Sequence, residues 1–240
     1  MKIDVSIITF TMGREVYLKK CINSVFSDML GCDLKYEHHI IFQGVAPSRK
    51  IRLLYDSLPN VVLHEWPKNI GVANGLNEII PKCNGELIFK MDEDCKIVSE
   101  YLIEKAFDIY NRFPNIVFSP FPVGLINNKG GPIGVSHFVY KKDDSFYTFR
   151  KVQHLGGFAR FAPKYIYQNF KFELDLINGI SGNEDGQFSL HCIHNNIGLY
   201  YLENNLIVEH QESTYGQIAR YPEYFSNRKN ESSININIVE

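Results

Sequence analysis

The chain has 240 residues, of which 45% are hydrophobic and 22% charged, and its formal net charge is -2 at pH 7. This is an ordinary globular composition, long enough to bury about 70 to 75% of the surface in one large domain or two small ones. The charge provides no overall positive field for a phosphate backbone, so we expect no binding of nucleic acid. Any bound phosphate must be held by local groups.

The cysteines indicate the compartment. Five of them are scattered without C-x-x-C spacing, and their odd number cannot form a complete set of disulfides, which favours a reducing environment. The N-terminus is too short and too acidic for a signal-peptide core, and no apolar stretch approaches about 18 residues. We therefore expect a cytoplasmic protein with no transmembrane segment; peripheral membrane contact remains compatible with the sequence.

Short apolar runs alternate with segments of helical periodicity in the first half of the chain. The predicted strands are 5–10, 38–42, 60–66 and 85–91, and the predicted helices are 14–26, 48–58, 70–80 and 99–113. Ser99 is the expected N-cap of the last helix. Four such alternations predict an α/β fold with a mostly parallel sheet flanked by helices, in which ligands bind beyond the carboxyl ends of the strands.

The second half is richer in glycine, proline and aromatic residues. It predicts β-like segments at 136–142 and 145–152, helices from about 163 and over 184–195, and a hairpin or two short strands at 199–210. No linker divides the chain, so we predict one domain over 1–225. The polar residues 226–240 form either an edge strand or a disordered tail.

Three acids follow the fourth predicted strand, in the stretch IFKMDEDCKI at 88–97. If strand geometry persists, the period of two places Asp92 and Asp94 on one side and Glu93 on the other, where we expect Glu93 to be structural. Two carboxylates about 6 to 7 Å apart suit a hard divalent cation. The alternative interpretation is a solvated loop that begins to cap the next helix.

A second pattern lies in KNIGVANGLN, at 68–77. Asn69, Ala73 and Asn77 recur every four residues, so one helical face is small and polar. Gly71 and Gly75 each weaken a helix by up to ~1 kcal/mol relative to alanine, which makes sense if something approaches the backbone closely. That something is either a ligand or the sheet itself.

Two further candidates lie in the second half. In ISGNEDGQFSLH, Ser181 or Asn183 is a candidate N-cap, with Glu184 and Asp185 in the first turn of a helix. One of these acids could instead be a general base, if it faces a cleft. His210 ends a predicted strand; it is either structural or the imidazole ligand of a site whose other ligands are carboxylates.

Taken together and in order, these segments resemble the family 2 glycosyltransferases of the GT-A fold. The resemblance covers about residues 3 to 215. It rests on six segments, VSIITFTMGR, NIGVANGLN, MDEDC, GGFARFAPK, GNEDGQFSLH and VEHQES.

The resemblance implies a role for each matching position. Asp94 matches the direct metal ligand of a D-x-D pair, with Asp92 nearer the ribose or a metal-bound water, and His210 matches a metal-ligand histidine of many members. Asp185, with Glu184 before it, matches an acidic pair whose second residue serves as catalytic base. The positions implied to bind the nucleotide are Thr9, Arg14, Gln43, Asn69, Gly71, Ala73, Asn77 and Asp92.

One position departs from the family pattern. The second strand usually ends in an acidic pair that meets the nucleotide base, whereas this chain has Gln43 and Gly44. Gln43 can donate and accept hydrogen bonds and so can read a uracil edge, but it cannot act as a carboxylate. This departure bears on the identity of the nucleotide more than on the fold.

The implied reaction is the inverting, Mn²⁺- or Mg²⁺-dependent transfer of a sugar from a nucleotide sugar, with a UDP-sugar favoured. The acceptor would be a hydroxyl of a glycan, a lipid-linked molecule or another compound, in polysaccharide synthesis. Residues 1–112 would form the nucleotide-sugar half and 113–225 the acceptor half. The alternatives are a sugar-phosphate nucleotidyltransferase, and a catalytically inactive nucleotide- or sugar-binding protein on the same fold.

Overall fold

The computed structural model describes residues 2–124, 136–142, 145–173, 184–203 and 205–211. The elements of the first half are, in chain order, β1 (Val5–Thr11), α1 (Glu15–Met29), β2 (Tyr36–Gln43), α2 (Arg49–Asp56), β3 (Val61–Trp66), α3 (Gly71–Ile79), η1 (Ile80–Lys82), β4 (Leu87–Met91), β5 (Cys95–Ile97) and α4 (Leu102–Arg112). Those of the second half are β6 (Ile116–Ser119), β7 (Phe121–Val123), β8 (Ser136–Lys142), β9 (Ser145–Lys151), β10 (Ala159–Pro163), α5 (Lys164–Gln168), α6 (Glu184–His194), β11 (Gly198–Leu202) and β12 (Ile207–His210).

Within these described residues, nine strands form the main sheet, in the order β3-β2-β1-β4-β10-β6-β11-β9-β8. The first four strands of this order are parallel, as the strand-helix alternation predicts. β10 runs antiparallel to both of its neighbours, β4 and β6, and so interrupts the parallel arrangement. A second sheet, β5-β12-β7, has three strands. The α/β class is therefore confirmed, with a mixed region beside the parallel one.

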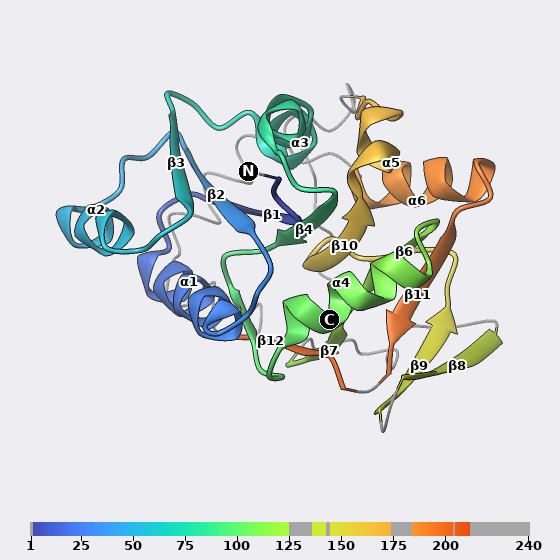
Figure 1. Ribbon diagram of the computed structural model, residues 1–240. Coiled ribbons are helices and arrows are strands. Elements are labelled where there is room, and N and C mark those ends of the chain that lie inside the picture. The colour runs from blue at the N-terminus through green and yellow to red at the C-terminus, as the bar shows by residue number, and fades with distance from the viewer. Residues whose placement is uncertain (1, 125–135, 143–144, 174–183, 204, 212–240) are drawn as a thin grey trace, which may run out of the picture.

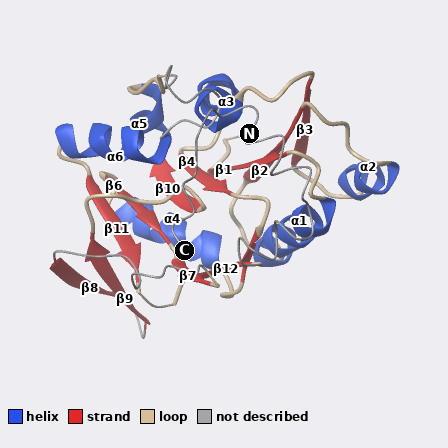
Figure 2. Ribbon diagram, turned by 180° about the vertical axis from the view of Figure 1, so that it is seen from behind, coloured by secondary structure: helices blue, strands red, loops and turns tan. Residues whose placement is uncertain are grey.

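Helices cover both faces of the main sheet, α1 and α4 on one and α3, α5 and α6 on the other (Figure 1). The period of two along β1 decides which residues each face receives. Val5 and Ile7 pack in the core beneath α1 and α4, whereas Ile8 and Phe10 pack beneath α3. Figure 2 shows the same layers from behind.

The start of α4 corrects one prediction. Ser99 is not its N-cap: the helix begins at Leu102, and Ser99 Oγ instead accepts a hydrogen bond from the N–H of Ile207 at 2.6 Å. The cap is supplied by α1, because the carboxylate of Asp28 accepts hydrogen bonds from the N–H groups of Leu102 and Ile103 at 2.8 and 2.9 Å. This contact joins the two helices of one face.

Some predictions fall outside the described residues. These are the two candidate N-caps Ser181 and Asn183 and the tail 226–240. The segment 199–210 forms two short strands, β11 and β12, which belong to different sheets. Among the residues that the structure describes, no helix is long and apolar enough to span a bilayer.

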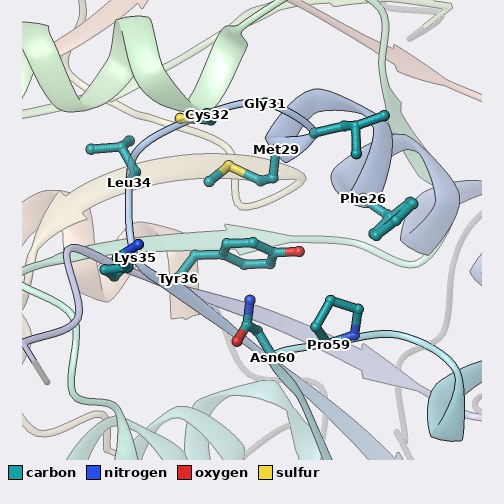
Figure 3. Close-up of a pocket in the computed structure, with 10 residues that line it drawn as sticks. Phe26, Met29, Gly31, Cys32, Leu34, Lys35, Tyr36, Pro59 and Asn60 are labelled. Carbon is teal, nitrogen blue, oxygen red and sulfur yellow. The ribbon is translucent and has the colours of Figure 1, made fainter.

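A pocket of about 240 Å³ opens between the end of α1 and the start of β2, at the amino-terminal edge of the sheet (Figure 3). Its lining residues are Phe26, Met29, Leu30, Gly31, Cys32, Leu34, Lys35, Tyr36, Pro59 and Asn60. None of the residues predicted for the site belongs to this lining. The candidate site lies at the other edge, where β1, β2 and β4 end.

Candidate functional site

The three acids occupy a tight turn between the two sheets. β4 ends at Met91, and the N–H of Cys95, where β5 begins, donates to the carbonyl of Asp92 at 3.0 Å. The N–H of Asp92 donates to the carbonyl of Phe158 at 2.8 Å, which ties the turn to the residues that precede β10. The acids therefore lie at the carboxyl end of a parallel strand, as predicted, but on a turn and not on a continued strand.

This turn changes the distribution of the three carboxylates. Glu93 and Asp94 face the same guanidinium: Arg14 Nε lies 2.7 Å from Glu93 Oε1, and Arg14 Nη1 lies 3.1 Å from Asp94 Oδ2. Thr11 Oγ1 also donates to Glu93. The prediction that Asp92 and Asp94 share one side, with Glu93 opposite, is wrong, because the period of two ends with the strand at Met91.

Glu93 is structural, as expected, but it is not peripheral. Its carboxylate is almost completely buried, with 3% of the side chain exposed. Burial raises its pKa, and the charge of Arg14 and the hydrogen bond from Thr11 oppose this rise. Breaking a buried ion pair by removing one partner is strongly destabilising, so we expect Glu93→Gln to destabilise the fold.

His210 reaches the acid turn through the small sheet. β12 pairs antiparallel with β5 so that His210 lies opposite Cys95, and the N–H of Gln211 donates to the carbonyl of Asp94 at 2.8 Å. This register places His210 Nε2 3.6 Å from Asp94 Oδ2. Two residues far apart in the sequence are thus held side by side by a three-residue ladder.

The residues at this point fit a divalent cation. Ligand atoms of Asp94, Cys95 and His210 all lie within 4.8 Å of one another. A carboxylate oxygen and an imidazole nitrogen are ligands that Mn²⁺ and related ions accept. Arg14 contacts the same oxygen of Asp94 that faces His210, so a bound cation would share or replace the charge that the guanidinium supplies there.

Asp92 belongs to a different group of charges, centred on Lys90. Lys90 Nζ lies 2.5 Å from Asp92 Oδ1 and also donates to the carbonyl of Gly157. The lysine is buried, whereas 40% of the Asp92 side chain is exposed. Burial by itself lowers the pKa of Lys90, but the charges of Asp92, Asp185 and Glu184 outweigh it and raise the pKa, so the ammonium stays charged.

Asp185 approaches this group from α6. Its Oδ2 accepts a hydrogen bond from the N–H of Gly157 at 2.8 Å, and its Oδ1 lies 3.3 Å from Nη1 of Arg160. Arg160 is fully buried on β10, with its guanidinium 4.2 Å from the centre of the Phe188 ring. Any side chain at position 157 would overlap the Asp185 carboxylate, so this close approach requires glycine.

Glu184 begins α6, directly before Asp185. Burial raises its pKa, and the neighbouring charge of Asp185 raises it further. Helix α6, which begins with both acids, covers the same face of the main sheet as α3 and α5 (Figure 1). The charges of both acids and of Asp92 act on Lys90 and raise its pKa. The structure therefore brings the predicted acidic pair to the same edge as the acid turn.

Neither Lys90 nor Arg160 was identified from the sequence. They are cross-strand partners on β4 and β10. The two residues are neighbours because these strands, which are far apart in the sequence, pair in the sheet. One signal was present: Lys90 is a charged residue in the otherwise apolar run LIFKM, two positions before the acids. A buried lysine there needs an anionic partner.

The residues predicted on α3 take mainly structural positions. Asn77 clamps the backbone of Phe172: its Nδ2 donates to the Phe172 carbonyl at 2.8 Å, and its Oδ1 accepts from the Phe172 N–H at 3.0 Å. Ala73 is buried in the core beneath the helix. A Cβ on Gly75 would lie 2.6 Å from Phe10 Cε1, so tight packing on the sheet explains this small residue.

The start of α3 lies beside the end of β2. Gln43 Oε1 accepts a hydrogen bond from the N–H of Ile70 at 3.1 Å, and Asn69 Oδ1 accepts one from the N–H of Gly71 at 2.9 Å. Gly71 has a φ of 76°, a conformation that favours glycine. Gln43, Asn69 and Gly71 are thus brought together at the carboxyl edge of the sheet, as predicted.

Thr9 lies inside the fold. Its side chain is fully buried, and its Oγ1 lies 3.0 Å from His38 Nε2 on the neighbouring strand. On the same strand Thr11, two residues later, reaches the acid turn instead. Thr11, and not Thr9, is therefore the residue of this strand that contacts the acid turn.

The arrangement separates two kinds of charge at one edge of the sheet. On the α1 side, Arg14, Asp94 and His210 form a group that can hold a cation or an anionic ligand. On the α6 side, Asp185 is oriented by two donors and 27% of its side chain remains exposed. A carboxylate that is fixed and partly open to solvent can accept a proton from a hydroxyl that binds beside it.

Comparison with known proteins agrees with this architecture. Among curated proteins, no sequence matches the chain significantly. A fragment of TarS from S. aureus in complex with UDP-GlcNAc has a TM-score of 0.64 and 14% identity; the match covers 88% of this chain and 59% of that one. GalNAc-T7 with UDP, GalNAc and Mn²⁺ has a TM-score of 0.63 and 12% identity, covering 87% of this chain and 44% of that one.

These likenesses establish the GT-A fold, and the chain spans only 59% and 44% of the two proteins. The sequence comparison is more specific. The profile of glycosyl transferase family 2 matches residues 6–170, which is more than half of the chain and includes the acid turn, the α3 segment and the residues around Gly157. The chain therefore belongs to glycosyl transferase family 2.

Proposed function

We propose that the protein is a metal-dependent, inverting glycosyltransferase that moves a sugar from a nucleotide sugar to a hydroxyl acceptor. The observation that carries the proposal is the placement of Asp94 beside His210 on one side of the edge and of Asp185 on the other. The two carboxylates have distinct surroundings and so can take distinct roles. Family membership supports the same reaction class.

Asp94 and His210 would hold the cation, Mn²⁺ or Mg²⁺, with Asp92 nearer the ribose or a water on the ion. The cation would stabilise the negative charge that develops on the leaving nucleoside diphosphate, a contribution of several kcal/mol. Arg14 would orient Asp94 and add positive charge beside the phosphates. Gln43, Asn69 and Gly71 would line the nucleotide where β2 and α3 meet.

Asp185 would be the base that takes the proton of the acceptor hydroxyl. The N–H of Gly157 and the guanidinium of Arg160 fix its carboxylate, so that one oxygen can face the attacking hydroxyl in a defined direction. Direct attack on the anomeric carbon from the face opposite the leaving group inverts that centre. Glu184, which directly precedes Asp185 at the start of α6, is the alternative base.

The donor and the compartment follow from weaker observations. TarS and GalNAc-T7 are solved with UDP-GlcNAc and with UDP, respectively, and this supports a UDP-sugar as donor here. All five cysteines are free, which supports a reducing compartment and so the cytoplasm. The acceptor would be a glycan, a lipid-linked molecule or another hydroxyl compound of polysaccharide synthesis.

The first prediction concerns metal-dependent binding of the nucleotide. UDP should raise the melting temperature of the protein only when Mn²⁺ or Mg²⁺ is present, because binding to the native state alone stabilises it. Asp94→Asn should lose this shift, since it removes one charged ligand. Glu209→Gln is the matched control: Glu209 lies next to His210 but forms a surface ion pair with Lys96, so this variant should keep the shift.

The same experiment separates binding from transfer. Asp185→Asn should retain the metal-dependent UDP shift and lose turnover, measured as hydrolysis or transfer in a screen of UDP-sugars. A persistent shift in Asp94→Asn would remove the metal assignment. Full activity of Asp185→Asn would move the base elsewhere, and binding without turnover of any nucleotide sugar by the wild type would favour a nucleotide-binding protein.

A further inference from the structure

A second cluster of potential ligands lies at the opposite edge of the sheet and plays no part in the proposed reaction. Glu37 and His39 lie near the start of β2, and Cys83 directly follows the short helix η1. The ligand atoms of these three residues lie within 4.8 Å of one another. All three side chains are buried, with exposed fractions of 8%, 3% and 1%.

The ring of His39 is the residue that points to a ligand. Its Nδ1 lies 2.9 Å from Nε2 of His64 on the neighbouring strand β3, and the two rings are stacked. Its Nε2 lies 3.2 Å from Glu37 Oε1, within the distance of an ion pair. In the part of the chain that the structure describes, this buried nitrogen has no hydrogen-bond partner.

Such geometry is expected of two ligands of one ion. If His39 donates its Nδ1–H to His64, its Nε2 presents a lone pair towards an anionic oxygen, which is repulsive unless a cation lies between them. Metal-bound histidines commonly donate their other ring N–H in this way, which fixes the tautomer. The contact with His64 therefore matches the orientation that a metal ligand needs.

The charges of the cluster are also suited to a cation. Burial alone would raise the pKa of Glu37, but hydrogen bonds from Asn84 and Ser6 outweigh it and lower the pKa to about 2, so the carboxylate stays charged. Burial raises the pKa of Cys83 to about 12, so without an ion the group is a neutral thiol. Lys164 is close, but its ammonium donates to the carbonyl of Cys83.

We propose that Glu37, His39 and Cys83 bind one Zn²⁺ ion, with His64 orienting the imidazole of His39. Zinc accepts thiolate, imidazole and carboxylate ligands, and a water would complete its usual four, whereas Mg²⁺ and Mn²⁺ do not favour a thiolate. Binding replaces the S–H bond of Cys83 with an S–Zn bond, and the proton leaves to the solvent. The ion, the thiolate and the carboxylate then sum to zero charge, which suits a buried site.

This site would be structural and distinct from the cation at the acid turn. It would join β2 to the turn between η1 and β4, where the carboxylate of Glu37 already binds the N–H of Asn84 at 2.5 Å. Cys83 is flanked in sequence by two exposed residues, Lys82 and Asn84, which gives the ion a route from solvent. A structural site of this kind contributes to folding stability.

Cobalt and zinc titrations of the full-length protein, stripped with a chelator and kept reduced, test the proposal. Co²⁺ should produce the near-ultraviolet absorption of a cobalt–thiolate bond with one equivalent per chain, and Zn²⁺ should abolish it. Zinc binding should release the proton of the Cys83 thiol, because a cysteine binds zinc as the thiolate. No nucleotide is present, so the result does not depend on the proposed transferase activity.

Variants assign the absorption to this cluster. Cys83→Ala and His39→Gln should lose it, whereas Cys95→Ala and Asp94→Asn, which alter the cluster at the acid turn, should keep it. An absence of the absorption in the wild-type protein would overturn the proposal, and so would its persistence in Cys83→Ala. If either Cys83→Ala or His39→Gln fails to fold, the wild-type titration and the Cys95→Ala comparison still decide the outcome.

Discussion

Two buried cations lie side by side at the carboxyl edge of the sheet, where β4 ends. Lys90 and Arg160 are direct partners across the β4–β10 ladder, and less than 4% of each side chain is exposed. Like charges placed opposite each other on a sheet are destabilising, so the pair needs anions nearby. Asp92 and Asp185 supply them, and both carboxylates are held in place as a result.

Replacement of Lys90 by methionine tests whether the buried lysine holds these carboxylates in place. Methionine fills a similar volume but removes the charge and the hydrogen bond to Gly157, whose N–H orients Asp185. We expect kcat to fall about tenfold or more, which corresponds to ~1.4 kcal/mol of transition-state stabilisation, with a smaller change in KM.

Lys164→Met provides the control for this substitution. Lys164 also donates to a backbone carbonyl, that of Cys83, but at the far edge of the sheet. Its loss should leave kcat unchanged if the effect of Lys90 is local. Steady-state kinetics of both variants make the comparison, and equal losses of kcat would assign Lys90 a general role in folding.

The sequence predicted which residues gather at this edge better than it predicted their contacts. Asp94 and His210 were recognised as one site, and the structure places them together. The pairing of Glu93 with Arg14 was not foreseen, because the tight turn after Met91 rotates each side chain away from the strand pattern. Turn geometry of this kind depends on hydrogen bonds to distant segments, here to Phe158.

Among the elements, α3 shows how a pattern of small residues can have a packing origin. The small face at Ala73 and the two glycines, Gly71 and Gly75, left two explanations open, a ligand or the sheet. The structure supports the sheet for Ala73 and Gly75, since one is buried in the core and the other touches Phe10. The first turn, at Gly71, instead adjoins Asn69 at the carboxyl edge of the sheet.

Gly75→Ala should therefore destabilise the protein even though alanine is the better helix former. The propensity gain is ~1 kcal/mol, whereas inserting a methyl group into a packed interface costs about 1 to 3 kcal/mol. We expect a net loss of about 1 kcal/mol in the free energy of unfolding, measured with urea. Glu78→Ala, at an exposed position of the same helix, should be close to neutral.

A more stable Gly75→Ala variant would contradict this assignment and restore the alternative of a ligand against that face.

The start of α4 illustrates why a helix boundary cannot always be predicted from the residues around it. Its N-cap could not be read from Ser99, because the groups that satisfy its first N–H donors come from Asp28, seventy-four positions earlier than Leu102. A helix boundary that depends on a side chain of another helix cannot be predicted from the local sequence alone.

At the scale of the whole molecule, buried histidines couple stability to pH. Burial lowers the pKa of His38 from 6.5 to about 3, and burial lowers that of His64 to about 4. The unfolded chain therefore binds protons below about pH 6.5 that the folded chain does not bind. The stability contributed by these neutral rings is present above pH 6.5 and is lost as the pH falls towards 3.

The free energy of unfolding should accordingly fall as the pH drops from 6.5 to 4, by about 1.4 kcal/mol per pH unit for each histidine that remains neutral in the fold. His38→Gln, which keeps a hydrogen-bonding group beside Thr9, should have a shallower slope. Urea unfolding at several pH values, with a chelator present, measures both slopes. Identical slopes for the two proteins would show that His38 is not the group responsible.

The position of β10 determines how the molecule can be assembled. This strand comes from the second half of the chain, yet it is inserted beside β4 in the middle of the main sheet, where it supplies Arg160 and is preceded by Gly157. Neither half can complete this edge of the sheet alone, and contacts between residues so distant in the sequence form late and slowly. On a ribosome, the acid turn would emerge long before its partners, so the nascent first half would present the open flank of β4 until β10 arrived.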